Sequence, residues 1–115
     1  MPQDFAPGDF LVFQLEAGYG LLRVLGSEET DDDKVWHLAA YRDLFMDVDS
    51  AEAATKRPSS LTVELSHVAL TNRAFESTQV ARIATAPLDE AYRKWHVEAT
   101  EPVQDRSIRL LLGLR

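Results

Sequence analysis

Residues 7–26, PGDFLVFQLEAGYGLLRVLG, place two apolar runs on either side of a glycine-containing turn, and this pattern constrains the fold more than any other. In the first run apolar residues recur at every second position, the period of a half-buried strand. Those inward residues are Leu11, Phe13 and Leu15. Two glycines in the turn tolerate the backbone angles that a short connection needs. We therefore predict an antiparallel hairpin with strands over residues 9–16 and 21–25.

Three further segments have the composition of strands. Residues 35–41 predict a third strand, and residues 61–66 predict a fourth because apolar and polar residues alternate there without interruption. The inward residues would be Trp36, Leu38 and Ala40 in the third strand, and Leu61, Val63 and Leu65 in the fourth. Residues 67–75 are expected to connect to a last strand over 78–84.

Three segments from residue 50 onward have helical patterns. Asp49, followed by Glu52 at the spacing of a capping box, predicts a short helix over residues 50–56. After Pro87, apolar residues recur at helical spacing as far as Trp95, with acids in the first turn and bases in a later one. The tail, residues 105–115, fits either a helix or a strand, and the helix is slightly favoured.

The length of 115 residues and the order of these segments predict one small α+β domain. We expect a strongly bent antiparallel sheet, or an SH3-like barrel, of about five strands with one or two C-terminal helices. Residues 1–84 would be mainly β and residues 85–115 mainly helical. With no cysteine, the chain can form neither a disulfide nor a zinc–thiolate site.

The net charge of −7 arises within one segment of the sequence. Residues 27–55 hold nine acids and two bases, whereas the rest of the chain is balanced. Such a distribution argues against a nucleic-acid partner, because binding of a duplex depends on Lys and Arg neutralising phosphates. It favours a basic protein partner, attracted by an acidic surface, although acidic loops also serve solubility alone.

Tyr19 is the aromatic residue best placed to meet a partner, because a turn can expose its ring; alternatively, the ring folds back over the hairpin. Together with the acidic segment it gives the candidate partner-binding residues. These are Tyr19, Glu28, Glu29, Asp31, Asp32, Asp33, Asp47 and Asp49.

No pattern of catalytic or metal-binding residues is found in the sequence. His37, His67 and His96 do not have the spacing of zinc ligands, and each is expected to be a polar partner at the edge of the core. Residues 47–58 begin like a calcium loop but lack its glycine and its final glutamate. We therefore predict no catalytic residue, no metal site and no cofactor. A cryptic enzyme or small-ligand module would instead gather histidines and a carboxylate in one cleft.

The N-terminal residues do not resemble a secretory signal, and the apolar runs are far shorter than the roughly 20 residues of a membrane span. These features predict a cytoplasmic protein without a membrane partner. The apolar tail, with Leu110, Leu111, Leu112 and Leu114, would support a homodimer if it were exposed.

The opening residues resemble the start of immunity protein family 26. The resemblance rests on Gly8-Asp9, the apolar strand, Gly18-Tyr19-Gly20 and Arg23-Val24-Leu25, and it extends more loosely to Trp95. It implies a bacterial protein that neutralises a secreted toxin by binding it, with no cofactor. The same stretch is similar to the SH3-like domain by which CarD-type regulators bind RNA polymerase, which implies a transcription-associated adaptor as the alternative.

Overall fold

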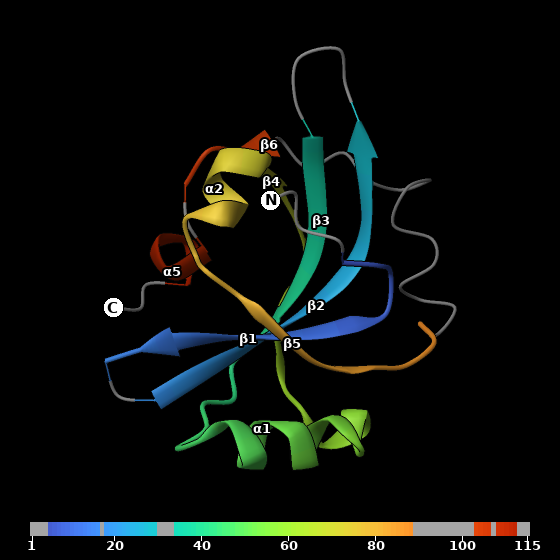
Figure 1. The fold of residues 1–115 in the computed structure, drawn as a ribbon, viewed down its shortest axis with the longest axis vertical. Helices are drawn as coiled ribbons and strands as arrows, with labels where there is room; N and C mark the ends of the chain where they lie inside the picture. The colour runs from blue at the N-terminus through green and yellow to red at the C-terminus, as the bar shows by residue number, and fades with distance from the viewer. Residues whose placement is uncertain (1–4, 17, 30–33, 89–102, 107, 113–115) are drawn as a thin grey trace.

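The computed structural model describes residues 5–16, 18–29, 34–88, 103–106 and 108–112. These residues form an α+β domain with one six-stranded sheet in the order β5-β1-β2-β3-β4-β6 and short helices packed around it (Figure 1). Neighbouring strands are antiparallel except β4 and β6, which are parallel. The strands are β1 (Asp9–Leu15), β2 (Gly18–Glu29), β3 (Lys34–Tyr41), β4 (Val63–Thr71), β5 (Ala81–Thr85) and β6 (Val103–Gln104). The helices are α1 (Val48–Thr55), α2 (Asn72–Glu76) and α5 (Ile108–Leu111), and a short 3-10 turn, η1, spans Pro58–Ser60.

The predicted hairpin is confirmed as β1 and β2, which pair from Phe10↔Arg23 to Leu15↔Gly18. Strand β2 begins at Gly18 rather than Leu21, so the glycines expected in the turn belong to the strand. Gly18 adopts φ +155°, and a Cβ built there would lie 2.4 Å from the carbonyl oxygen of Phe45, so only glycine fits. The second strand continues beyond the predicted end at Leu25 and reaches Glu29, because its outer part pairs with β3. Polar residues can extend a strand in this way when a neighbouring strand supplies the hydrogen bonds.

The main apolar cluster covers one face of the sheet. The alternate residues predicted to face inward in the hairpin and in the third strand are all found in it. Trp36 stacks on Phe75 of α2 with ring centroids 4.5 Å apart, and Phe5 meets both rings edge-on. From α5, Ile108 is fully buried in the same cluster. Helices α2 and α5 therefore close this face (Figure 1).

The sheet does not close into a barrel, so the predicted SH3-like barrel is wrong. Closure would require the two edge strands to pair with each other. Instead β5 pairs with β1 and β6 with β4, at opposite ends of the strand order. Strand β6 has only two residues, too few to continue the sheet further. The alternative expectation of an antiparallel sheet is confirmed in part, because the sheet is open and mostly antiparallel but has six strands rather than about five.

The fourth strand lies further along the chain than the alternation predicted. It spans Val63–Thr71 rather than residues 61–66, so the segment expected to be a connection continues the strand. Its buried residues are Val68, Ala69 and Leu70, whereas Val63 is exposed. Leu61 precedes the strand and packs against a separate cluster on the other face.

Helix α1 begins two residues earlier than predicted. Asp47, not Asp49, is its N-cap, because Asp47 has extended backbone angles and its Oδ1 accepts a hydrogen bond from the Ser50 amide at 2.7 Å. Asp49 lies inside the first turn, where an acidic side chain interacts favourably with the positive end of the helix dipole.

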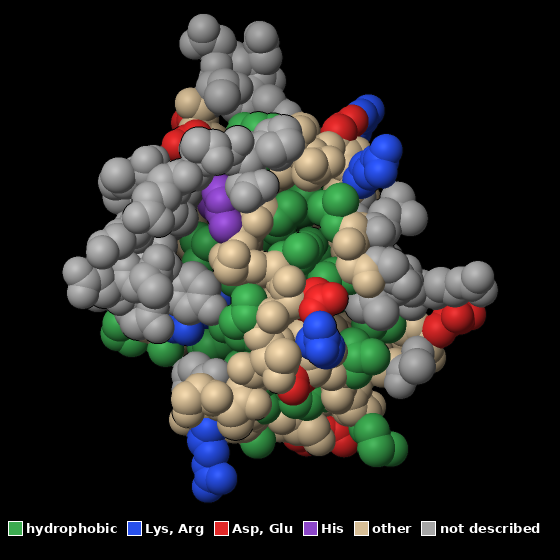
Figure 2. Space-filling model, turned by 180° about the vertical axis from the view of Figure 1, so that it is seen from behind, with side chains coloured by type: hydrophobic (Ala, Val, Ile, Leu, Met, Phe, Trp, Pro, Cys, Tyr) green, Lys and Arg blue, Asp and Glu red, His purple; other side chains and the backbone are tan. Residues whose placement is uncertain are grey.

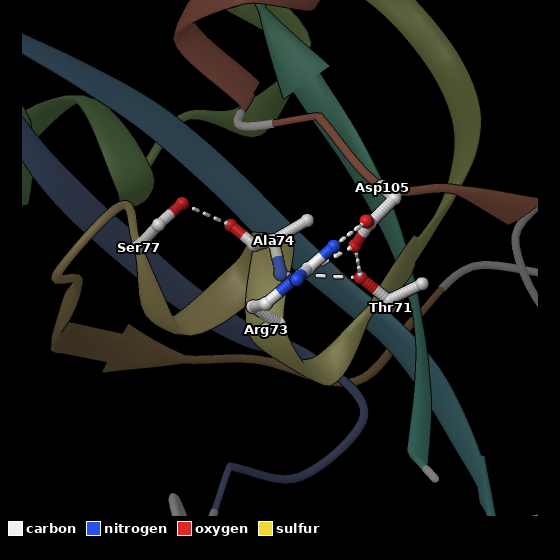
Figure 3. A network of polar contacts seen from close by, with 5 residues as sticks. All are labelled: Thr71, Arg73, Ala74, Ser77 and Asp105. Atoms are coloured by element: carbon white, nitrogen blue, oxygen red, sulfur yellow. Dashed lines mark hydrogen bonds and ion pairs between the residues drawn. The ribbon is translucent and has the colours of Figure 1, made fainter.

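A polar network fastens α2 to the chain after β6 (Figure 3). The Thr71 hydroxyl donates to Asp105 Oδ1 at 2.6 Å and accepts from the Ala74 amide, which makes Thr71 the N-cap of α2. Arg73 forms an ion pair with the same carboxylate. The hydrogen bond from Arg73, and then that from Thr71, lowers the pKa of Asp105.

The C-terminal third differs in part from the prediction. The segment expected to be mainly helical also contributes β6, while α5 confirms the helical alternative for part of the tail. The helix predicted after Pro87 falls largely on residues 89–102, outside the described residues. Because Leu111 and Leu112 pack against the main cluster, these two side chains do not provide the exposed surface that a tail-mediated homodimer would need.

Candidate functional site

The acidic segment is divided between two ends of the molecule. Glu28 and Glu29 end β2 at one tip of the sheet, whereas Asp47 and Asp49 lie at the start of α1, near the opposite end (Figure 1). Strand β3 runs between these regions, and its eight residues span about 26 Å at roughly 3.3 Å per residue. Asp31, Asp32 and Asp33 lie outside the described residues. The described acids therefore do not form one continuous face.

Tyr19 lies at the α1 end, beside the segment that leads into this helix. Its amide donates to the Phe45 carbonyl oxygen at 2.8 Å, and its own carbonyl accepts from the Phe45 amide at 2.9 Å. The side chain is half-buried, a position between the two alternatives that the sequence allowed. This backbone pairing places Tyr19 next to the residues before α1.

Exposed apolar side chains occur in that same segment. Met46 is 89% exposed and Leu44 48% exposed, and Val48 is exposed as well. We define the α1-end surface as the following residues: Tyr19, Leu44, Met46, Asp47, Val48 and Asp49. The sequence pattern indicated the aromatic and acidic members but not the apolar ones, because exposed apolar residues have the same pattern as core residues.

The α1-end surface contains two acidic residues, Asp47 and Asp49. Hydrogen bonds from Ser50 lower the pKa of Asp47. Asp49 and Glu52 are exposed on α1, whereas the bases Lys56 and Arg57 follow its last turn. The entrance of α1 therefore combines negative charge with exposed apolar area.

A second cluster joins two of the predicted histidines. His37 of β3 and His67 of β4 are on the same face of the sheet, because His37 pairs with Ala69, two residues from His67. Nδ1 of His37 and Nε2 of His67 are 2.7 Å apart, so one donates and the other accepts a hydrogen bond. Their rings stack with centroids 5.0 Å apart. Figure 2, which views the molecule from behind, shows histidine atoms reaching the surface.

Glu28 completes this cluster from β2, with Oε2 at 3.6 Å from Nε2 of His37. Burial lowers the pKa of His37 below its ordinary value of 6.5, and a positive charge on His67 would lower this pKa further, whereas Glu28 raises it. His37 is only 6% exposed, and His96 lies outside the described residues. The arrangement can hold or pass one proton.

The described residues contain no group of three or more His, Cys, Asp or Glu side chains arranged to hold a metal ion. Among these same residues, no helix combines the length and the apolar character needed to cross a bilayer.

Arg23 is a buried charged residue that was not among the predicted site residues. It is 4% exposed, and its Nη2 donates to the carbonyl oxygens of Ala86 and Pro87 at 3.0 and 3.1 Å. Its guanidinium lies 4.4 Å from the centre of the Phe10 ring. These contacts hold the chain after β5 against β2, which is a structural role.

The Gly8-Asp9 pair, on which the family resemblance partly rests, also has a structural explanation. Gly8 adopts φ +96°, and a Cβ there would lie 2.3 Å from the Ala86 carbonyl oxygen. The buried Asp9 carboxylate accepts from the Ala6 amide at 2.9 Å and lies 3.5 Å from Arg82 Nη1. Both residues thus fix the start of β1.

Comparisons with known proteins return no relative: no family model, no curated protein and no solved structure matches this chain. The resemblance to immunity protein family 26 stays a prediction.

Proposed function

We propose that this protein is a non-catalytic binding domain whose partner is a protein with a basic, partly apolar surface. The observation that carries the proposal is Met46, which is almost fully exposed beside Asp47 and Asp49. Methionine and aromatic side chains are enriched in protein interfaces, where they bury large apolar areas. The surrounding acids would attract a basic partner and orient it before contact.

The proposed biological role is that of an immunity-type inhibitor, which covers a basic region of a bacterial toxin. This role follows from the family resemblance and from the negative charge, and it needs neither cofactor nor metal. The alternative of a polymerase-binding adaptor has less support, because it rested on an SH3-like barrel and the sheet is open.

The test is a pull-down from lysate of the source cell, eluted with a salt gradient. The variant Leu44→Ser/Met46→Ser removes the exposed apolar area, and Asp49→Asn removes one charge without disturbing the N-cap. Val103→Ser is the matched control, because Val103 is 49% exposed on β6. We expect a stoichiometric basic partner to be retained by the control and by the wild type, and to be lost from the double variant.

Co-expression then tests the proposed role. If the captured partner arrests growth when expressed alone, the wild-type protein should restore growth and the double variant should not. Recovery of polymerase subunits would support the adaptor instead. Equal capture by the wild type and the double variant would remove the α1-end surface from the proposal.

A second candidate function is supported by the cluster of His37, His67 and Glu28. Two histidines and a carboxylate gathered in one place are the arrangement expected of a small-ligand or enzymatic module. A thermal-shift screen of small acids and amines against the wild type and His67→Gln tests this alternative. A ligand that stabilises only the wild type would favour it.

A further inference from the structure

Strand β5 pairs with β1 along one of its edges. Its other, outer edge pairs with none of the strands that the structure describes. The Ala86 amide donates to the Gly8 carbonyl oxygen at 3.1 Å. In an antiparallel ladder, a bond between the residues that flank a pair in this way identifies that pair as non-bonded, so Asp9↔Thr85 is non-bonded. The amide and the carbonyl of Thr85 therefore point away from β1.

A cavity of about 550 Å³ lies between this edge and α1. Its apolar floor comes from Phe10 and Ala84, which face each other across β1 and β5. Helix α1 contributes Glu52 and Thr55, and Lys56 at the C-cap of the helix completes this wall. An open strand edge beside a pocket walled by a helix offers two kinds of contact, one to a backbone and one to a side chain.

We propose that this edge and cavity bind an extended segment of a partner protein, which adds to β5 as a further strand. An extended backbone presents an amide and a carbonyl at alternate residues, which matches the two outward groups of Thr85. Because side chains alternate between the faces of a sheet, one residue of the segment would direct its side chain toward α1. The apolar floor selects an aliphatic or small aromatic side chain at that position.

Features of β5 itself favour a short segment over a second copy of this chain. The register between β1 and β5 shifts at Phe10/Leu11, and Arg82 places a charged side chain next to the irregularity. Bulges and charges on an edge strand oppose long edge-to-edge pairing. Only the end of β5 near Thr85 combines regular pairing with the adjacent cavity, so a segment of a few residues fits better than a symmetric β5–β5 contact.

This site is separate from the α1-end surface, which lies at the opposite end of α1, and it does not depend on the proposed function. The variant Thr85→Pro tests it, because proline removes the outward amide while the inward bonds of Ala84 and Ala86 remain possible. Thr85→Val is the matched control, since it changes the side chain and keeps the amide. Urea denaturation of both variants verifies that each is folded.

The probe is a displayed library of random linear peptides, selected on the wild-type protein. We expect enriched peptides with an apolar residue, which bind Thr85→Val within about threefold of the wild type and Thr85→Pro at least about tenfold more weakly. If the proline variant does not fold, hydrogen exchange on the wild type replaces it. The Thr85 amide should then exchange more slowly once the selected peptide is added.

Three results would overturn the proposal: no enrichment on the wild type, equal peptide affinity for Thr85→Pro, or unchanged exchange at Thr85 in the complex. A wild-type dimer that Thr85→Pro converts to a monomer would overturn the proposed occupant, since a second copy would then cover the edge.

Discussion

On one face of the sheet a single apolar cluster extends from β1 to β4 and is closed by α2 and α5, whereas the other face divides its apolar side chains between two smaller clusters. The first face is also rich in aromatic contacts, with Trp36, Phe75 and Phe5 in mutual contact. On the second face, buried polar groups lie beside the small clusters, namely Arg23 and His37.

This difference indicates that the two faces have different roles, one mainly in stability and the other in the polar sites. The continuous cluster buries much apolar area, so the first face supplies most of the free energy of folding. The second face must satisfy buried polar groups through specific partners, and it carries the histidine pair and the cavity beside α1. Substitutions on the two faces should therefore differ in size and in their dependence on pH.

The largest effect is expected from Phe75→Ala on the first face. Phe75 is fully buried and stacked on Trp36, so its loss leaves a cavity and should reduce the free energy of unfolding by about 3–5 kcal/mol. Leu88→Ala, in the smallest cluster of the second face, should cost less, about 2 kcal/mol. Urea denaturation measures both. Equal losses would contradict the unequal division of stability between the faces.

The next effect concerns the buried charge on the second face. Arg23→Met keeps much of the side-chain volume but removes the hydrogen bonds to the Ala86 and Pro87 carbonyls, and should cost about 1.5–3 kcal/mol. The matched control is Arg42→Met, because Arg42 forms an exposed ion pair with Glu64 and should lose less than about 1 kcal/mol. If Arg23→Met lowers the free energy of unfolding no more than Arg42→Met does, the buried contacts of Arg23 add nothing to stability.

Substitutions at the N-caps of α1 and α2 also compare the two faces, and their expected effects on stability are smaller. Asp47→Ala removes the cap of α1 and should lower the melting temperature of the protein. Thr71→Ala removes the cap of α2 and also the hydrogen bond to Asp105, so it should cost more than Asp47→Ala. Thr71→Ser and Asp47→Ser, which retain a capping oxygen, should recover most of each loss. Thermal denaturation is sufficient to rank the four variants.

Local patterns in the sequence were sufficient to predict β1, β2 and β3, because alternation and turn glycines act over a few residues. The hairpin and the inward side chains Trp36 and Leu38 followed from such patterns. Strand β6 could not be predicted, since two residues have no periodicity and their pairing depends on a distant strand. The N-cap of α1 was misplaced because Asp47 and Asp49 both suit that position, and only the backbone angles distinguish them.

The candidate sites were less accessible to sequence reasoning. The histidine pair joins residues thirty positions apart, and their contact depends on the register of β3 with β4, which includes two shifts. The exposure of Met46 could not be inferred, since apolar residues before a helix are commonly buried. The separation of Glu28 from Asp47 follows from the length of β3. The sequence predicted this strand, but it did not show that the strand would place the two groups of acids at opposite ends of the sheet.

The last comparison between the faces is a dependence on pH that only the second face should show. Burial lowers the pKa of His37 in the folded protein below its ordinary value of 6.5, so the unfolded chain binds a proton more readily. Above pH 6.5 His37 is neutral in both states, and its contribution to the free energy of unfolding is fully present. Below pH 6.5 the unfolded chain binds the proton first, so this contribution is lost as the pH falls through the lower pKa of the folded protein. Because Glu28 opposes the shift, we rank this effect below the others.

Urea denaturation between pH 7.5 and about pH 5 measures this dependence, since Asp47 and Asp105, whose pKa values are lowered, remain ionised in that range. The wild type should lose stability on acidification, and His37→Gln should show a flatter profile. Glu28→Gln should steepen the loss, because it removes the group that favours protonated His37. A wild-type profile as flat as that of His37→Gln would mean that Glu28 and solvent compensate fully for the burial of His37. The second face would then bury its histidine pair without making stability depend on pH.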